Sequence, residues 1–491
     1  MSACSFSNPI KIRGVDDVIH CIDSRGKING RAGVIWWLAL GGLFLDAFSN
    51  SALSAGLNPM TRNLNLSATE VALLTSFSSW VAILFNPIGG WIADRWGRVP
   101  PLIIAKIMAV IGALLGMSSS SFSTIIIGRF FVGVSYGMDF AVAMAMLAEF
   151  TPVKLKSRLN TWQGVWYVAV FFILALALLF YSWDVGDAIW RYSIAVTALC
   201  GLIVLFFQFR YLVESPVWLA RKSRLSEAVI AMNKIYGENF ILAPKTEQKP
   251  VIGQAEKGAK NVLLIFRGVY LPRTILASTV QICQSIQYFG VGWYLPVISA
   301  AMFGKNFVYA TLCSLFFNVF GIVGGFLSPA IGRRLGLRRS SAIGFAVAFL
   351  VLLTLGLFSD SMPLWASLLV PALFILCHSG GPGANGKSLS SLSFRSELRA
   401  GANGVVGALG AIGAALGLFI FPVFRDLYGL QTTFLIMSAV PLFASIVCFA
   451  IPWDPTRTTI QPDNEPGAPQ FESPHSSYPE SMAPESNRST K

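Results

Sequence analysis

The chain has 491 residues, of which 54% are apolar and only 12% are charged, and its formal net charge is +13. Soluble globular domains carry about 25% charged residues. The composition therefore argues against a soluble enzyme, a secreted disulfide scaffold and a nucleic-acid-binding protein, and for a membrane protein with many spans.

The first half of the chain predicts six spans. Residues 1–32 are polar and mixed in charge, and we expect them to form a cytoplasmic segment that contains no signal peptide. A six-helix half is expected over residues 33–212. Its apolar runs lie at roughly 33–57, 70–92, 100–121, 124–148, 160–181 and 190–211.

The polar stretch 213–270 separates the two groups of spans and is expected to be a cytoplasmic loop. It contains one predicted helix, which Ser223 can cap. Leu225, Val229, Met232 and Tyr236 recur in it at helical spacing. We expect this helix to lie against the bundle of spans, and docking of a partner protein is the alternative.

A second six-helix half is expected over residues 271–452. Its apolar runs lie at roughly 271–298, 307–330, 340–358, 363–386, 401–424 and 431–452. The tail over 453–491 is rich in Pro, Ser and Glu, which predicts a disordered cytoplasmic segment. The sequence thus predicts an all-α membrane protein with twelve transmembrane helices in two halves.

Lys and Arg set the orientation, because they accumulate in cytoplasmic loops. With the N-terminus inside, the outside loops receive only Arg62, Arg191, Lys305 and Arg425, and most other basic residues fall inside. Both termini are therefore expected to be cytoplasmic. The charge of +13 is mostly a signal of topology and does not indicate an acidic partner.

The seven cysteines show no metal-ligand spacing, and most of them lie in apolar runs. We expect no disulfide, no metal site and no cofactor. The chain also shows no nucleophile–base set, so an enzyme is the least favoured function.

The two halves repeat one feature, a short basic loop that contains glycine after the second span. The first loop reads Gly90-Trp-Ile-Ala-Asp94-Arg95-Trp-Gly97-Arg98, and the second contains Gly332-Arg333-Arg334-Leu-Gly336. Two equivalent halves around a central loop match the parallel-repeat plan of transporters, with a substrate site between the halves.

The first of these loops resembles the signature loop of the major facilitator superfamily. Two further motifs resemble the sugar-porter branch of that family: Gly128-Arg129-x-x-x-Gly133 with Glu149-x-x-Pro152, and Glu214-Ser215-Pro216-x-Trp218-Leu219. Three segments resemble bacterial inner-membrane metabolite:proton symporters within it: Phe44-Leu45-Asp46, Gly137-Met138-Asp139 and Ser379-Gly380-Gly381-Pro382-Gly383. The resemblance covers roughly residues 15–455.

This resemblance implies a secondary active transporter that moves a small polar metabolite by alternating access with proton symport. The expected partners are the solute, protons and the lipid bilayer, with no nucleic acid, and the expected form is a monomer in the bacterial inner (plasma) membrane. A sugar, a sugar acid, an aromatic acid and other organic acids all stay open as substrates. A uniporter or exporter without proton coupling is the alternative function, followed by a sensor that does not transport.

Charged residues inside apolar spans are candidates for proton coupling, because each costs about 2.5–3.5 kcal/mol to insert. Asp46 in the first span falls between Arg129 and Asp139 of the fourth span in expected depth. We expect Asp46 to take up the proton, with Arg129 as its partner and Asp139 as the alternative site. A buried ion pair that only fixes helix register is the competing interpretation.

Several residues of the motifs lie at the cytoplasmic ends of spans. In the resembled family such residues form a cytoplasmic gate of ion pairs. The expected gate residues here are Asp94, Arg95, Gly97, Arg98, Glu149, Arg158, Glu214 and Arg399. Asp94 can also lie against a helix N-terminus of the second half, where the helix dipole favours a carboxylate.

Amide and aromatic residues supply the expected substrate site. Gln281, Gln284 and Tyr288 share one helical face of the seventh span, and buried amides need hydrogen-bond partners. The full set of candidates is Gln281, Gln284, Gln287, Tyr288, Trp162, Trp166, Trp293, His378, Asn385 and Lys387. Packing is the competing interpretation for each aromatic.

Residues 381–388 fit the nucleotide-binding P-loop pattern but lie inside an apolar run instead of after a strand. We expect this segment to break the tenth span. Lys387 would then lie toward the cytoplasmic end of the cavity and attract an anionic substrate, with His378 deeper in the span. Extension of the Lys387 side chain to the membrane interface is the alternative.

Overall fold

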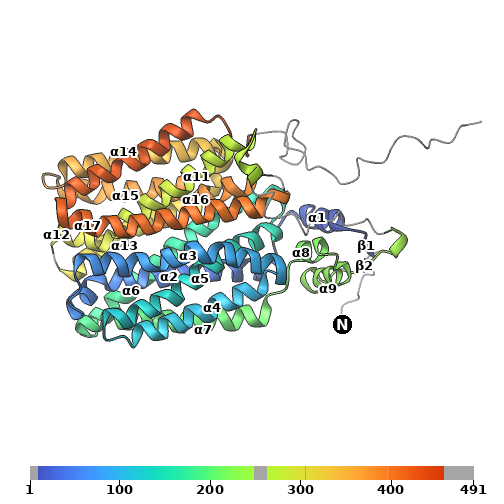
Figure 1. Ribbon diagram of the computed structural model, residues 1–491, viewed down its shortest axis with the longest axis horizontal. Coiled ribbons are helices and arrows are strands. Elements are labelled where there is room, and N and C mark those ends of the chain that lie inside the picture. Colours follow the sequence, from blue (N-terminus) through green and yellow to red (C-terminus); the bar gives the residue numbers. More distant parts are fainter. Residues whose placement is uncertain (1–8, 248–262, 305, 395, 458–491) are drawn as a thin grey trace, which may run out of the picture.

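Long helices run side by side along the molecule, and a small subdomain lies beyond one end of them (Figure 1). The computed structural model describes residues 9–247, 263–304, 306–394 and 396–457. The end of the bundle that carries the subdomain is called the α9 end below, after one of its helices, and the opposite end is called the far end. The α9 end is the end predicted to be cytoplasmic.

Six helices build the first half, and their turns are fixed by local capping. They are α2 (Gly30–Asn63), α3 (Ala68–Trp96), α4 (Val99–Met117), α5 (Phe122–Phe150), α6 (Thr161–Ser182) and α7 (Ile189–Tyr211). Ser67 begins α3 in a reciprocal capping box with Glu70, and Ser121 begins α5 in the same way with Thr124. The 3₁₀ turns η1 (Val153–Asn160) and η2 (Gly186–Ala188) connect later helices.

The second half contains broken and bent helices. In chain order it is formed by η4 (Leu263–Phe266), α11 (Tyr270–Gln287), the π-helical turn η5 (Tyr288–Gly292), α12 (Leu295–Phe303), α13 (Phe307–Leu335), α14 (Leu337–Phe358), α15 (Leu364–Gly380), α16 (Pro382–Leu392) and α17 (Ser396–Ala450). The predicted break of the tenth span is confirmed, because Gly381 separates α15 from α16. Two helices meet within α17 at Gly429, whose φ of 81° is left-handed.

Within the described residues, ten helices are long and apolar enough to cross a membrane. The count rises to eleven when 270–292 and 295–303, which are bent by 42° relative to each other, are taken as one span. One of the ten is the long segment 402–450, which includes the reversal at Gly429. The all-helical membrane architecture that the sequence predicted is therefore present.

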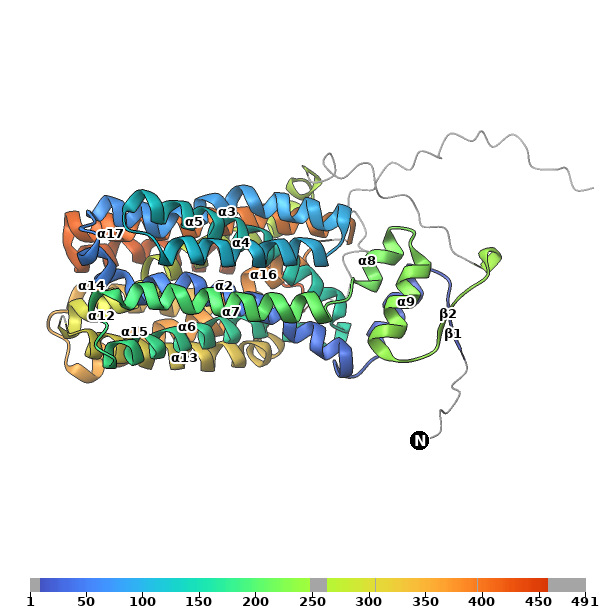
Figure 2. The same cartoon turned by 90° about the horizontal axis from the view of Figure 1, so that it is seen from below.

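The small subdomain joins the N-terminal segment to the central loop (Figure 2). It contains β1 (Ile10–Ile12), α1 (Val15–Asp23), α8 (Pro216–Arg221), α9 (Leu225–Tyr236), β2 (Phe240–Leu242) and the turn η3 (Lys245–Glu247). Strand β1 pairs in parallel with β2, with Ile10 opposite Phe240. This pairing was not predicted, because a three-residue strand leaves almost no pattern in a sequence.

The predicted loop helix is confirmed as α9, but its predicted cap is wrong. Arg224 occupies the N-cap position, and Ser223 lies one residue outside the helix with a φ of 60°. The buried side of α9 includes Leu225, Val229 and Met232, as their helical spacing indicated, whereas Tyr236 at its end is half-buried.

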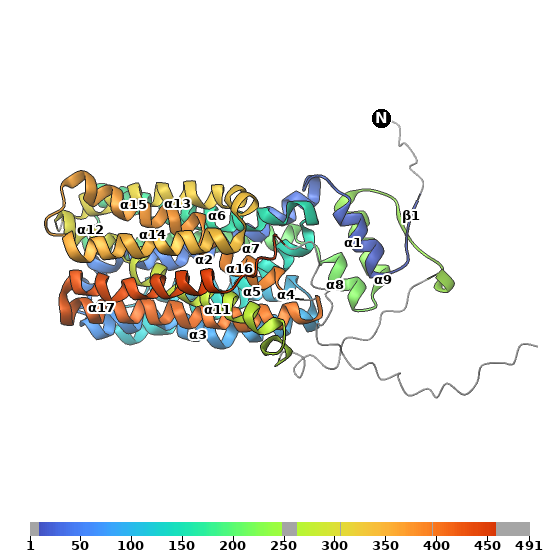
Figure 3. The same cartoon turned by 90° about the horizontal axis from the view of Figure 1, so that it is seen from above.

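Two helix pairs hold the halves together: α3 packs against α17, and α6 packs against α13 (Figures 1 and 3). Glycine makes the second contact close, because a Cβ atom on Gly325 of α13 would lie 2.5 Å from the backbone nitrogen of Gly164 on α6. The central cavity lies between these two contacts.

Candidate functional site

A cavity of about 40 Å³ lies between the two halves. Its walls come from both halves and are mostly aromatic rings and amide groups. The lining residues are Asn86, Tyr136, Phe140, Trp162, Gln163, Trp166, Gln281, Gln284, Ser285, Tyr288, Phe289, His378, Lys387, Gly407, Gly410 and Ala411. Seven of the ten predicted substrate residues are among them.

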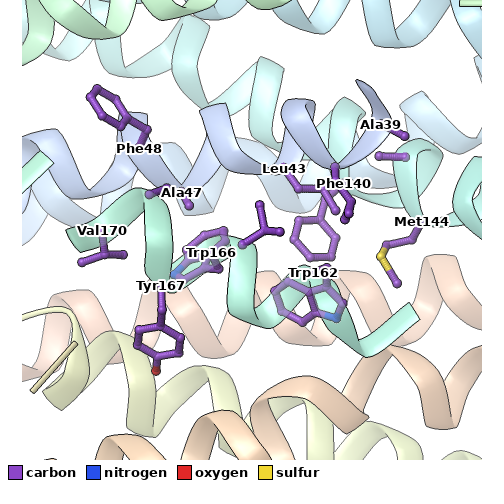
Figure 4. Packing of buried hydrophobic residues seen from close by; sticks show 14 of the residues in the cluster. Ala39, Leu43, Ala47, Phe48, Phe140, Met144, Trp162, Trp166, Tyr167 and Val170 are labelled. Atoms are coloured by element: carbon purple, nitrogen blue, oxygen red, sulfur yellow. The ribbon is translucent and has the colours of Figure 1, made fainter. Parts of the chain in front are cut away.

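The aromatic wall is built mainly on α6. Trp162 and Trp166 lie four residues apart and so share one helical face. The ring of Phe140 on α5 packs edge-on against Trp162 at 5.1 Å between centroids (Figure 4). The indole nitrogen of Trp166 donates to the hydroxyl of Tyr288 at 2.8 Å and connects the two halves.

Three buried polar atoms of the lining residues have no hydrogen-bond partner. They are the indole nitrogen of Trp162 and the side-chain oxygens of Gln163 and Gln281. Buried polar groups in proteins are almost always paired, so these atoms lack a partner that a solute or water could supply. The cavity therefore offers both donors and acceptors beside flat apolar rings, as sites for small molecules do.

The other three predicted substrate residues lie outside this lining. Gln287 is hydrogen-bonded through Nε2 to Nδ1 of His378 at 2.8 Å, and thereby orients a ring that does line the cavity. The Trp293 indole donates to the carbonyl of Asn50, at 3.3 Å, toward the far end. The amide of Asn385 donates to Ser340 Oγ at 2.8 Å.

Four further residues line the cavity that were not predicted to do so: Asn86, Tyr136, Phe140 and Gln163. Tyr136 and Phe140 are four residues apart in the same span as Asp139, a spacing that places both on one helical face. Nothing in the sequence separates that pair from ordinary packing residues.

Hydrogen bonds join the halves on the far side of the cavity. Ser54 Oγ donates to the carbonyl of Trp293 at 2.6 Å, and the hydroxyls of Thr75 and Tyr294 lie 2.8 Å apart. These residues come from α2 and α3 in the first half and from the segment between α11 and α12 in the second.

Asn160 joins the halves at the α9 end. Its amide nitrogen donates to Ser328 Oγ at 3.1 Å and to Asn385 Oδ1 at 3.0 Å, and its oxygen accepts from Ser388 Oγ at 2.5 Å. All four side chains are buried. The halves thus contact each other on both sides of the cavity.

The predicted pairing of Asp46 with Arg129 is wrong in this structure. Lys106 of α4, which the sequence analysis did not single out, lies 2.7 Å from Asp139 and 3.7 Å from Asp46, measured between its nitrogen and a carboxylate oxygen of each. Arg129 donates to Ser78 Oγ instead. The depth of a residue in a span does not fix the direction in which its side chain points.

Lys106, Asp46 and Asp139 form a buried charge cluster, called the lysine triad below. All three side chains are at most 3% exposed. Two carboxylates and one ammonium group leave one excess negative charge, which is costly away from water. One bound proton removes that excess, so the triad has the composition of a proton-binding site.

A second charge cluster lies at the α9 end and includes four of the predicted gate residues, Asp94, Arg98, Glu149 and Glu214, with Gly97, a fifth, beside Glu214. The guanidinium of Arg98 is 2.8 Å from Asp94 and 2.9 Å from Glu149. Burial alone would lower the pKa of Arg98, but the pairs with Glu149 and Asp94 outweigh it and raise that pKa. All these partners belong to the first half, whereas the contact between the halves at this end is made by Asn160.

Glu214 fixes the turn between α3 and α4. Its carboxylate accepts from the backbone nitrogens of Arg98 at 2.8 Å and Val99 at 3.1 Å, and also from Ser215 at 3.0 Å. Burial raises the pKa of Glu214, although these backbone donors counteract part of the effect. Gly97 lies directly against the carboxylate and has a φ of 111°. Glycine is therefore favoured there for two reasons: a Cβ atom would collide with Glu214, and other residues rarely adopt this φ.

The remaining gate candidates lie elsewhere. Arg95 sits over the ring of Trp91 with 5.6 Å from its guanidinium carbon to the ring centroid. Arg158 lines a hollow of about 440 Å³ at the α9 end, together with Lys154 and Arg333. The side chain of Arg399 lies outside the described residues.

Replacing Gly97 with alanine is expected to destabilise the protein by about 1–3 kcal/mol, because the new methyl group displaces Glu214 and the left-handed backbone is strained. Gly90→Ala is the matched control in the preceding helix, where a Cβ atom meets nothing within 4 Å. That change is expected to be neutral or to stabilise by up to about 1 kcal/mol. Thermal unfolding of the purified protein measures both, and equal melting temperatures for the two variants would contradict the role given to Glu214.

Known proteins match most of this chain. Residues 39–393 match the model of the Major Facilitator Superfamily. The putative metabolite transport protein YaaU of Escherichia coli is 27% identical over 416 residues, which are 84% of this chain and 89% of that protein. The arabinose-proton symporter of Bacillus subtilis is also 27% identical, over 84% of this chain and 88% of its own. The structure of the proton:xylose symporter XylE of E. coli is similar in fold, with a TM-score of 0.71 at 18% identity, over 86% of this chain and 96% of that one.

Proposed function

Because the chain belongs to the major facilitator superfamily and is a multi-pass integral membrane protein, we propose that it carries a small polar metabolite across the membrane by alternating access. The single observation that supports this most strongly is the position of the cavity. It lies between two halves that contact each other on both of its sides, through Thr75 and Tyr294 at one end and Asn160 at the other. Opening one set of contacts at a time would expose the cavity to one side of the membrane at a time.

The proposed topology has twelve crossings with both termini in the cytoplasm. Counting α11 with α12 as one span and α15 with α16 as another, and dividing α17 at Gly429, gives six helical crossings in the second half, to match the six of the first. The basic inside loops set the orientation. The proposed location is the inner membrane of a bacterium, and a single chain supplies both halves, so a monomer is sufficient.

Proton symport is the second part of the proposal, and the lysine triad is its site in place of the expected pair of Asp46 with Arg129. Lys106 can pair with two carboxylates but neutralises only one, so the triad is neutral with one proton and negative without it. Tyr136 and Phe140, which line the cavity, are on the same helix as Asp139. Helix α5 therefore carries residues of both the cavity and the triad, and it is the proposed connection between them.

Two similar proteins support proton coupling, since one is named a proton:xylose symporter and the other an arabinose-proton symporter. Uniport with a purely structural triad is the second candidate. Solute accumulation that is the same with and without a pH gradient would favour this second candidate.

Alternating access can be tested without knowing the solute. We expect a cysteine introduced at Ala411, which lines the cavity, to be labelled by an impermeant thiol reagent from either face of the membrane in a cysteine-free background. Asn160→Ala removes the hydrogen bonds that join the halves at the α9 end, which favours opening there by about 1–3 kcal/mol. Labelling from the cytoplasmic face should then rise several-fold and labelling from outside should fall.

Asn403→Ala is the matched control, because among the described residues the side chain of Asn403 bonds within the second half, to Ser391. It should leave both labelling rates unchanged. A wild-type cavity that is reached from one face only, with no shift in Asn160→Ala, would contradict alternating access.

A further inference from the structure

The central cavity contains a lysine, and no carboxylate lies among its described lining residues. Lys387 on α16 points at the ring of Phe140, with its nitrogen 4.7 Å from the ring centroid. A cation over an aromatic face is stabilised only modestly, by about 0.5–2 kcal/mol. A lysine enclosed between helices and held this way is suited to bind an anion.

The hydrogen-bonding groups around Lys387 are suited to the same kind of ligand. Phe140 contacts both Lys387 and Trp162, so a single ring separates the ammonium group from the Trp162 ring, whose indole N–H has no partner. Gln163 and Gln281 add amide groups whose oxygens are buried and unpartnered. An ammonium, an indole N–H and amide N–H groups are all donors to a carboxylate.

We propose that the transported solute is a small carboxylate, bound through Lys387 and the Trp162 indole. The rest of the solute would lie against the Trp166 and Tyr288 rings, and its own hydroxyl groups would pair with the glutamine oxygens. This inference rests on the proposed transport function and names its substrate class. It separates the chain from relatives whose names specify the uncharged sugars arabinose and xylose.

A neutral sugar would leave the Lys387 charge without an anionic partner when it fills the cavity and displaces water. A carboxylate supplies that partner. The proton would then also serve electrical balance, since one carboxylate and one proton cross the membrane together without net charge.

The test uses pairs of probes that differ in the carboxylate: glucuronate against glucose, benzoate against benzyl alcohol, and lactate against propylene glycol. Binding to the purified full chain at neutral pH is measured by calorimetry. We expect the acid of at least one pair to bind about 10- to 100-fold more tightly than its neutral partner, the range typical of a charge-assisted hydrogen bond. If no acid binds more tightly than its neutral partner, the proposal is overturned.

Lys387→Gln is expected to bring the affinity for the acid down to that for its neutral partner, while Lys387→Arg retains the preference for the acid. Lys154→Gln is the matched control, because Lys154 is exposed and lines the hollow at the α9 end instead of the cavity. Acid binding by Lys387→Gln equal to that of the wild type would overturn the assignment. If the variant does not fold, the comparison of acid and neutral probes on the wild type still tests the preference for a carboxylate.

Exchange of the bound probe in proteoliposomes tests the proposed transport function separately from the proposed carboxylate substrate. An acid that binds selectively but does not exchange contradicts transport and leaves the carboxylate assignment intact. A neutral probe that exchanges while the acids do not contradicts the carboxylate and leaves transport intact.

Discussion

Lys106→Met is expected to destabilise the protein by about 3–5 kcal/mol, the usual cost of removing one partner from a buried ion pair. Lys106 is fully buried, and its nitrogen lies within 4 Å of both Asp46 and Asp139. Methionine keeps the length of the side chain but leaves two buried carboxylates facing each other. Thermal unfolding of the purified protein should show a clear drop in melting temperature.

A double variant shows whether the stability lost in Lys106→Met comes from unpaired charge or from packing. Adding Asp139→Asn to Lys106→Met lowers the number of carboxylates to one, so a large part of the lost stability should return. Lys154→Met is the surface control and should change stability by less than about 0.5 kcal/mol. A double variant no more stable than Lys106→Met would show that the cost came from packing instead of charge.

Asp46→Asn is expected to abolish accumulation of solute driven by a pH gradient. A gradient of one pH unit is worth about 1.4 kcal/mol, which sustains about tenfold accumulation in symport with one proton. Without an exchangeable proton the ratio should fall to one. Exchange of solute at equal concentrations on both sides should survive, because it needs no net movement of protons.

The control for this variant is Asp187→Asn, which removes a carboxylate from an exposed ion pair with Arg62 at the far end. It should accumulate solute as the wild type does. Calorimetric binding of the solute to Asp46→Asn shows that the cavity is intact. Undiminished accumulation by Asp46→Asn would remove Asp46 from the coupling mechanism.

The sequence predicted the helices well, because their signal is local and strong. Long apolar runs, short basic loops and the glycine-rich segment at 381–386 led to the spans and to the break after α15. Seven of the cavity residues were also predicted, since amides and aromatics inside apolar spans are unusual enough to be noticed.

Lys106 could have been predicted and was not. It is a single charge inside the run 100–121, so the criterion that selected Asp46, Arg129 and Asp139 applies to it equally. Its partners could not have been predicted from one sequence, because pairing depends on how each helix is rotated about its axis.

One sequence also could not predict the contacts of Asn160 or the pairing of β1 with β2, because these depend on how distant segments are arranged in space. Both join segments far apart in the chain, Asn160 with Ser328 and residues 10–12 with residues 240–242. A polar residue at the start of a span looks like a loop residue until the facing helix is known.

Solute and proton are proposed to cross the membrane together, and this is tested by measuring both fluxes at the same time. Wild-type protein in proteoliposomes is given the labelled solute that it binds, with the membrane potential held at zero and the internal pH recorded. We expect the interior to acidify as solute enters, and an inward gradient of one pH unit to raise accumulation to about tenfold. Solute that enters without a pH change and stops at equal concentrations would contradict proton symport.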